Sequence, residues 1–131
     1  KQVPWLADAA ASQELELHEV TSTTVSEQIA AHQIATVDML KIDVEGFEAE
    51  ALAGLTQPVK SLSFEFTTIQ REVARACIER CAALGFVRFN AALGESQALV
   101  HESWQTAEGI GRWLAALPQD ANSGDIYALL P

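Results

Sequence analysis

The chain has 131 residues, 49% of them hydrophobic and 20% charged, which is enough apolar material for one folded domain with its own core. The formal net charge of −10 argues against nucleic acids and anionic membrane surfaces as partners, since both are bound through clustered Lys and Arg. No stretch approaches the roughly 20 consecutive apolar residues of a membrane-spanning helix, so we expect a single globular domain over residues 1–131.

The first part of the chain carries weak signals and then a clear helix start. Residues 1–13 show no period and are expected to form an irregular lead-in, and the alternation over 14–20 predicts a short strand with one solvent-facing side. Thr24 and Glu27 match a capping box, in which the threonine hydroxyl binds a free backbone amide and the glutamate reaches back. A helix is therefore predicted over residues 24–32.

The middle of the chain is the most regular part. Apolar residues predict strands over 37–44 and 61–67, and the segment 47–55 between them is expected to be a helix that ends near Gly54. A strand–helix–strand order with a short connection is typical of a right-handed crossover between parallel strands. We therefore expect these two strands to be neighbours in a parallel sheet.

A longer helix follows the second of these strands. Thr67 and Gln70 match another capping box, and Gly85 is suited to end the helix in the left-handed conformation. Cys77 and Cys81 are four residues apart and share one helix face, so both are expected to be small core residues. Two cysteines make neither a disulfide framework nor a zinc site, and their use fits a reducing cytoplasm.

The last third of the chain predicts two more strands and one helix. Strands are expected over 86–93 and 126–130, with a helix over about 104–117 that carries Ile110 and Leu114 on one face. The final strand follows an Asn-Ser-Gly-Asp turn and is expected to run antiparallel at one edge of the sheet. The predicted fold class is therefore α/β, with a mostly parallel sheet and an antiparallel edge hairpin.

Three acidic residues lie where the two central strands end: Asp43, Glu45 in the following turn, and Glu65. Ligands bind at the carboxyl ends of the strands in open parallel sheets, so Asp43 and Glu65 are expected to point into one crevice. A buried carboxylate needs a partner, which can be a base, a metal or a cationic ligand. Plainer interpretations remain open, because Asp43 could neutralise Lys41 or bind local backbone, and Glu45 is favoured at the positive end of the next helix.

The segment VDMLKIDVEGFEAEALAGL, residues 37–55, strongly resembles the signature segment of the FkbM-type methyltransferases. Its most specific part is the Asp-x-Glu-Gly turn between a strand and a helix, and the similarity extends over about residues 18–131. The resemblance implies a class I, Rossmann-like methyltransferase fold with S-adenosylmethionine as cofactor. It also implies methyl transfer to a hydroxyl group of a sugar or another small molecule.

One part of the family pattern is missing. Members carry, upstream, a strand that ends in a glycine-rich turn and a second strand that ends in an acid for the cofactor ribose. Gly109 and Gly111 form the only Gly-x-Gly pair of the sequence, and they fall inside a predicted helix. Because no Met precedes Lys1, the true start of the gene product is expected to be missing. The chain resembles the C-terminal half of such an enzyme, a partial fold that we expect to be inactive by itself.

The resemblance also implies roles for individual residues. Asp43 would face the cofactor sulfonium or orient the acceptor hydroxyl and accept its proton, with Glu65 as a second catalytic acid. Asp43 and Glu45 would contact the cofactor. Asn90, Glu95 and Asp125 lie in the region similar to the acceptor-side wall of the family's cleft, although loop polarity alone explains them equally well.

Two other functions remain open at this stage. The missing cofactor turn favours a non-catalytic Rossmann-like scaffold or dimerisation module, because strand 37–44 would lack a neighbour on one edge and could pair with a second copy. Alternatively, Asp43 and Glu45 could hold a divalent metal for a nucleotide-sugar transferase. No third ligand is evident and the three histidines are far apart, so we expect no metal between Asp43 and Glu65.

Overall fold

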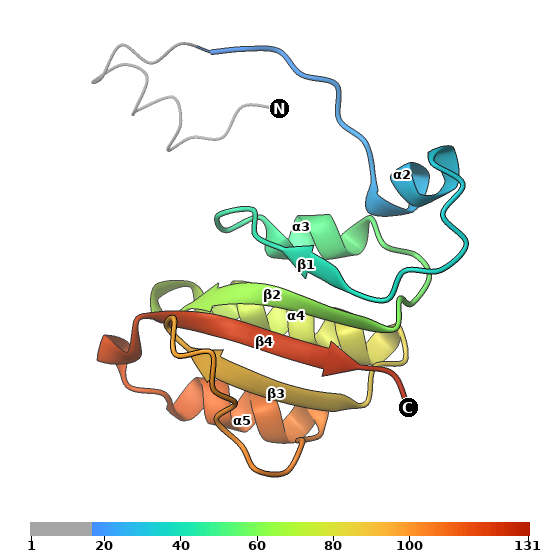
Figure 1. The fold of residues 1–131 in the computed structure, drawn as a ribbon. Coiled ribbons are helices and arrows are strands. Elements are labelled where there is room, and N and C mark those ends of the chain that lie inside the picture. Colours follow the sequence, from blue (N-terminus) through green and yellow to red (C-terminus); the bar gives the residue numbers. More distant parts are fainter. Residues whose placement is uncertain (1–16) are drawn as a thin grey trace.

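The computed structural model describes residues 17–131, which contain a four-stranded mixed sheet (Figure 1). The strands stand in the order β1-β2-β4-β3, with the bounds β1 (Leu40–Ile42), β2 (Ser61–Thr67), β3 (Arg88–Leu93) and β4 (Ser123–Leu129). β1 and β2 are parallel, as predicted, whereas β4 runs antiparallel to both β2 and β3. The prediction of a mostly parallel sheet is wrong, because two of the three strand pairings formed by the described residues are antiparallel.

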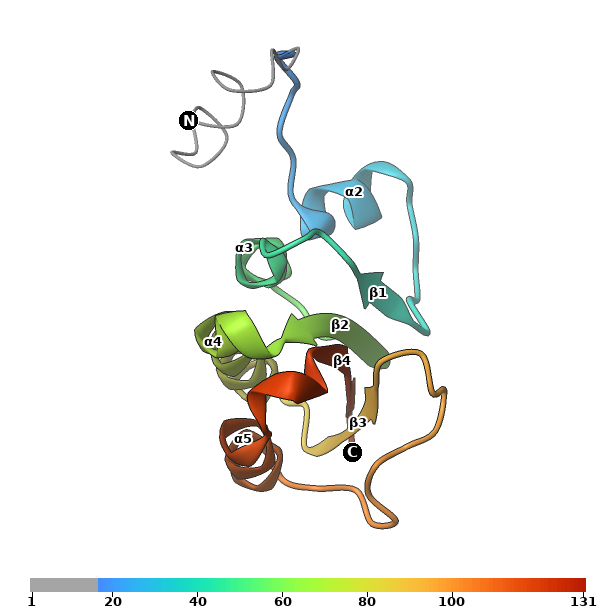
Figure 2. The ribbon, with the colours of Figure 1, turned by 90° about the vertical axis from the view of Figure 1, so that its left-hand side faces the viewer.

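Three helices share one face of the sheet (Figure 2): α3 (Glu48–Ala53), α4 (Arg71–Ala83) and α5 (Ala107–Ala116). α4 packs on β2 and lies between α3 and α5. The predicted helices 47–55 and 104–117 are thus present but shorter at both ends, as frayed helix termini usually are. The helices leave the opposite face of the sheet uncovered over its central strands.

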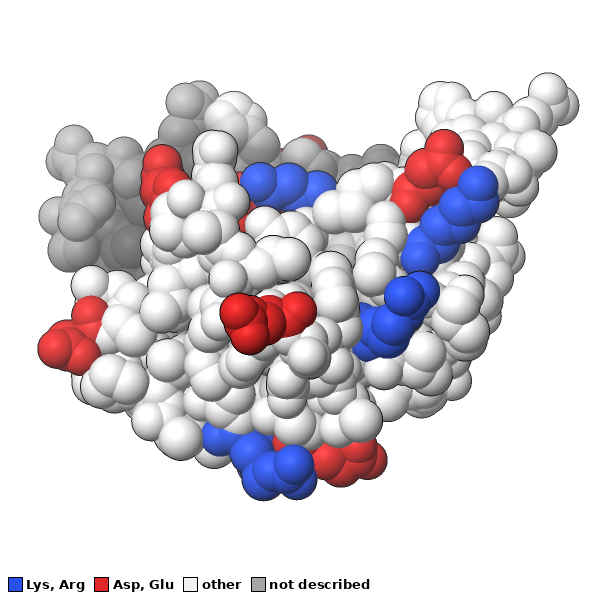
Figure 3. Space-filling view, turned by 60° about the horizontal axis from the view of Figure 1, so that its bottom comes forward, with Lys and Arg blue, Asp and Glu red and all other residues white. Residues whose placement is uncertain are grey.

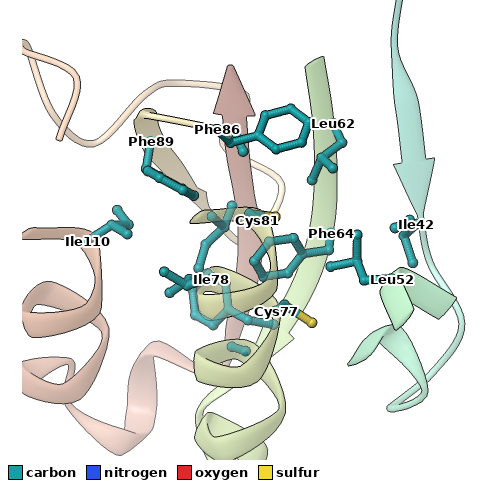
Figure 4. Close-up of a cluster of buried hydrophobic side chains, with 14 of the residues drawn as sticks. Ile42, Leu52, Leu62, Phe64, Cys77, Ile78, Cys81, Phe86, Phe89 and Ile110 are labelled. Atoms are coloured by element: carbon teal, nitrogen blue, oxygen red, sulfur yellow. The ribbon is translucent and has the colours of Figure 1, made fainter. Parts of the chain in front are cut away.

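The core lies between this helical layer and the sheet (Figure 4). On β2 the side chains of Leu62, Phe64 and Phe66 point to the helices and are buried, as the period of two along a strand requires. Cys77 and Cys81 of α4 are free, fully buried thiols, which confirms the prediction that they are core residues. Each large apolar side chain buried in this way contributes roughly 1.5–3 kcal/mol to folding.

The start of the described chain is regular only from Thr24 onward. The lead-in expected over 1–13 and the first three residues of the expected strand 14–20 lie outside the described residues, and residues 17–20 have no regular structure. α2 (Val25–Ala31) follows Thr24, whose hydroxyl accepts a hydrogen bond of 3.1 Å from the Glu27 amide. The predicted N-terminal cap at Thr24 is therefore confirmed, whereas the second half of the capping box differs, because the Glu27 carboxylate accepts from the Thr23 hydroxyl at 3.0 Å.

The end of α4 also follows its prediction. Gly85 has a φ of 100°, and its amide donates to the Ala82 carbonyl at 3.1 Å. The Phe86 amide donates to the Cys81 carbonyl at 3.0 Å, which completes a Schellman motif. Because Phe86 takes part in this cap and its side chain is buried, β3 begins at Arg88 and not at residue 86 as expected.

The second predicted capping box is wrong. Thr67 makes no side-chain cap, and a short 3₁₀ helix, η1 (Thr68–Gln70), separates it from α4. The hydroxyl of Thr68 donates instead to the carbonyl of Gln119 at 2.8 Å. This tertiary contact fixes the turn that the capping pattern was expected to fix.

The expected strands 37–44 and 126–130 also differ from the structure. β1 is only three residues long, because among the described residues it pairs with β2 alone and the chain turns at Glu45, where φ is 51°. β4 is longer than predicted and lies inside the sheet, between β2 and β3. The described edge opposite β1 is β3, which the following loop contacts through bridges at Phe89 and Ala92.

Among residues 17–131, no helix is long and apolar enough to cross a bilayer. Lysine and arginine side chains are scattered over the face seen in Figure 3, and they do not gather into a basic patch there.

Candidate functional site

The face of the sheet turned away from α3–α5 carries polar side chains at its centre. On β2, Ser63 and Glu65 alternate with the core residues and therefore point to this face. The strand register places Lys41 of β1 opposite Ser63, and Asp125 of β4 opposite Glu65. Asp43 follows directly after β1 at its carboxyl end. Neighbouring strands thus bring three acids and one base together.

The three acids and Lys41 line an open cleft with a volume of about 610 Å³. Its charged lining consists of Lys41, Asp43, Glu65, Glu95 and Asp125. Tyr127, Gln97 and Ser123 add neutral polar groups. The cleft carries four acids against one base among the described residues that line it, so its field attracts a proton or a cationic group.

The acids of the cleft influence one another. Burial raises the pKa of Glu65, and the charges of Asp43, Glu45, Asp125 and Glu48 raise it further. Burial also raises the pKa of Asp125, against the opposing effect of Lys41 and together with that of Asp43. A positive group placed between Glu65 and Asp125 would relieve this repulsion.

The structure brings four of the six predicted site residues into the cleft: Asp43, Glu65, Glu95 and Asp125. Residues 17–131 show no ion pair between Lys41 and Asp43. The geometry therefore does not support the interpretation that Asp43 only neutralises Lys41. Lys41 lines the same cleft as Asp125, and its charge opposes the rise of the Asp125 pKa. The alternation of charged residues along 41–45 was the sequence pattern that predicted charged side chains on this face of the sheet.

Asn90 lies elsewhere and has a structural contact. Its side chain is fully buried, and its amide nitrogen donates to the carbonyl of His101 at 2.9 Å. Its side-chain oxygen accepts from the amides of Ala91 and His101 at 2.9 and 3.1 Å. Asn90 therefore holds the loop after β3 onto the sheet and does not line the cleft.

Glu45 lies in the turn from β1 to α3, outside the cleft, and lines a second, smaller cavity of about 230 Å³. Glu48, Glu65, Thr67 and Gln70 line the same cavity. Glu48 was missed by the sequence analysis, because an acid in the first turn of a helix is usually explained by the helix dipole and solvent. The only signal for it was the density of acids in the segment EGFEAE.

No metal centre is evident in the part of the chain that the structure describes. No group of three or more His, Cys, Asp or Glu residues is placed there to hold an ion. His32 bonds to Gln28 on the surface, and His101 contacts the ring of Trp113 edge to face.

The cleft fits only one part of S-adenosylmethionine. Its acids suit the positive sulfonium, whereas Gly109 and Gly111 lie inside α5 and cannot form a phosphate- or carboxylate-binding turn. The turn from β1 to α3 contains a glycine in the left-handed region, Gly46, whose φ is 96°. The described residues therefore provide an acidic cleft and, beside it, this glycine turn.

In open α/β sheets, small ligands bind in the crevice outside the carboxyl ends of the strands, and the cleft lies at this edge. The FkbM methyltransferase domain matches residues 3–108, and the chain belongs to this family. Comparisons with curated proteins and with solved structures give no match.

Proposed function

We propose that the chain takes part in S-adenosylmethionine-dependent O-methylation of a sugar or small-molecule hydroxyl. The observation that supports this most strongly is the meeting of Asp43 and Glu65 in one cleft at the carboxyl ends of adjacent parallel strands. The family membership supports the same class of reaction. In this proposal Asp43 and Glu65 are the catalytic carboxylates, while Glu95 and Asp125 form the acceptor side.

The proposed chemistry needs little more than placement and charge. The acceptor oxygen must lie in line with the methyl group, so most of the rate comes from positioning. Asp43 would orient the acceptor hydroxyl and accept its proton, and the negative cleft would hold the sulfonium beside it. Glu45 lies in the turn next to Asp43 and would contact the cofactor from the side of the second cavity.

The proposal is tested by binding, with S-adenosylhomocysteine as a neutral matched ligand. We expect the 131-residue chain to bind S-adenosylmethionine with a dissociation constant well above ~1 µM, because the cleft contacts only the sulfonium end. We also expect S-adenosylmethionine to bind more tightly than S-adenosylhomocysteine, because only its sulfonium carries the positive charge that the acids attract. Isothermal titration measures both constants.

Asp43→Asn is the variant that tests the site directly. We expect it to reduce the preference for the sulfonium by about fivefold to tenfold, or roughly 1–1.4 kcal/mol, and to leave the melting temperature nearly unchanged. Asp120→Asn removes the same charge from the exposed turn η2 (Gln119–Ala121) and serves as the control. Equal binding of the two ligands, or an unchanged preference in Asp43→Asn, would speak against the proposed function.

A non-catalytic scaffold or dimerisation role is the second candidate. It is supported by β1, which among the described residues has a sheet neighbour on one side only. We further propose a reducing compartment such as the cytoplasm, which suits the two free cysteines.

A further inference from the structure

The second cavity lies beside the cleft and shares Glu65 with it. It opens between the turn from β1 to α3 on one side and η1 with the start of α4 on the other, and its volume is about 230 Å³. By the same measure a single water molecule needs only about 10–15 Å³. The cavity therefore has room for a group of several heavy atoms.

Glu48 is the unusual residue of this cavity. It is only 4% exposed, yet residues 17–131 provide no hydrogen bond and no ion pair to its carboxylate. Its carboxylate oxygens are not among the enclosed, unpaired polar atoms of the described residues, so they are open to the cavity that the residue lines. The place of Glu48 at the start of α3 stabilises this charge little, because a helix dipole contributes about 0.3–1 kcal/mol to a nearby acid and α3 has six residues.

The other polar groups of the cavity are mainly acceptors as well, apart from the Gln70 amide, which can also donate. The hydroxyl oxygen of Thr67 is buried and has no hydrogen-bond partner among the described residues. Glu45 and Glu65 add two more carboxylates. Burial raises the pKa of Glu65, and the charges of Asp43, Glu45, Asp125 and Glu48 raise it further. A matching ligand must therefore donate hydrogen bonds and carry positive charge.

The rest of the lining is apolar. Phe66, Val73 and Ala74 contribute side chains from β2 and α4, and Ile69 lies at the rim with 76% of its surface exposed. Such a wall suits the hydrocarbon stem of a ligand. It does not suit a hydrated Mg²⁺ ion, which needs an octahedron of oxygen atoms, and the described residues do not place three metal ligands together.

We propose that this cavity binds the protonated primary amine of a small molecule, with Glu48 as the main carboxylate and the apolar wall against its stem. An ammonium donates up to three hydrogen bonds, and the carboxylates of Glu45, Glu48 and Glu65 that line the cavity can accept them. The site goes beyond the proposed methyl transfer and does not depend on it. It would act on the cleft through Glu65, which both share.

The test compares two probes of the same size in titrations followed by ¹⁵N NMR of the whole chain. n-Butylamine is protonated at neutral pH, because alkyl ammonium groups have a pKa near 10.4, whereas n-butanol is neutral. We expect the amine, and not the alcohol, to shift the amide signals of residues 45–48 and 67–70. NaCl added to the n-butanol titration keeps the ionic strength equal in the two experiments.

Glu48→Gln is the decisive variant, and Glu102→Gln, in the exposed loop after β3, is its control. We expect Glu48→Gln to weaken amine binding at least about tenfold, a difference of ~1.4 kcal/mol, and Glu102→Gln to leave it unchanged. Because Glu48→Gln keeps the shape and removes an unpaired charge, its melting temperature should equal or exceed that of the parent chain.

Four results would each overturn the proposal. They are the absence of shifts with the amine, equal shifts with amine and alcohol, unchanged amine binding in Glu48→Gln, and a clearly lower melting temperature of that variant. A titration with MgCl₂ adds a further arm. If MgCl₂ shifts the same amide signals, and these shifts disappear in Glu48→Gln, the cavity is a metal site and not an amine site.

Discussion

Glu65 is the residue at which the cleft and the second cavity meet, and its charge is opposed from several directions. It stands opposite Asp125 in the sheet and is influenced by Asp43, Glu45 and Glu48. Its pKa in the folded chain is raised above the ordinary value of 4.5, so folding favours the protonated form. Because protonation is coupled to folding, Glu65 contributes to the free energy of unfolding at pH values below its ordinary pKa. This contribution is lost as the pH rises through the raised pKa.

Glu65→Gln should therefore stabilise the chain at neutral pH. We expect its melting temperature to be higher than that of the parent by about 1–3 °C near pH 7, because the substitution removes a charge that is repelled in the folded state. The difference should vanish near pH 4, where the carboxyl group is largely protonated in both states. Differential scanning calorimetry at both pH values measures this, with Glu102→Gln as the control. A lower melting temperature near pH 7 would show that the charge of Glu65 has a stabilising partner.

At the scale of single elements, two glycines of the chain have opposite roles. Gly85 ends α4 with a φ of 100°, and a Cβ there would meet nothing closer than 4.0 Å. Gly111 lies inside α5, and a Cβ there would have no neighbour within 4 Å. Crowding is therefore absent at both positions, and the backbone conformation alone decides the effect of a substitution.

We expect Gly85→Ala to destabilise the chain by about 1–2 kcal/mol, which is the cost of a left-handed conformation for a residue with a Cβ. Gly111→Ala should stabilise it by about 0.5–1 kcal/mol, because alanine is the better helix former. Urea denaturation of the two variants measures both changes, and each variant is the control of the other. A destabilised Gly111→Ala would mean that α5 needs flexibility at this position.

Local elements could be predicted from the sequence where local hydrogen bonds define them. The caps at Thr24 and Gly85 depend on residues within one or two turns, and both are confirmed. The cap at Thr67 is wrong because a distant carbonyl, that of Gln119, binds the neighbouring Thr68 hydroxyl. Periodicity contains no information about such a contact.

The order of the strands needed information that the sequence pattern does not carry. β4 lies between β2 and β3, where Gly124 allows a close approach: a Cβ at this position would lie 2.3 Å from the carbonyl oxygen of Ala92. The cleft could be predicted because strand alternation placed Asp43 and Glu65 at the same end of adjacent strands. Glu48 could not, because its burial follows from the packing of α3 beside α4.

At the scale of the whole molecule, an unpaired strand edge favours association of two copies, and the net charge opposes it. Within residues 17–131, β1 has a neighbour on one side only, so its other edge offers backbone groups for pairing with a second copy. Exposed apolar side chains lie close to it in the sequence, at Met39, Val44 and Phe47. The net charge of −10 on each copy opposes association, and salt screens this repulsion.

We therefore expect the chain to form a salt-dependent homodimer through β1. Light scattering coupled to size exclusion should give the monomer mass of 14.2 kDa at about 0.01 M salt, and a rising average mass at about 0.15 M as the protein concentration increases. Met39→Lys places a charge next to the edge and should keep the chain monomeric, since lysine protects strand edges in natural sheets. Val87→Lys is the matched control, because Val87 is 48% exposed like Met39 but precedes β3 on the far side of the sheet. A monomer under all of these conditions, or equal effects of the two lysines, would exclude β1 as the interface and leave the scaffold role without its structural support.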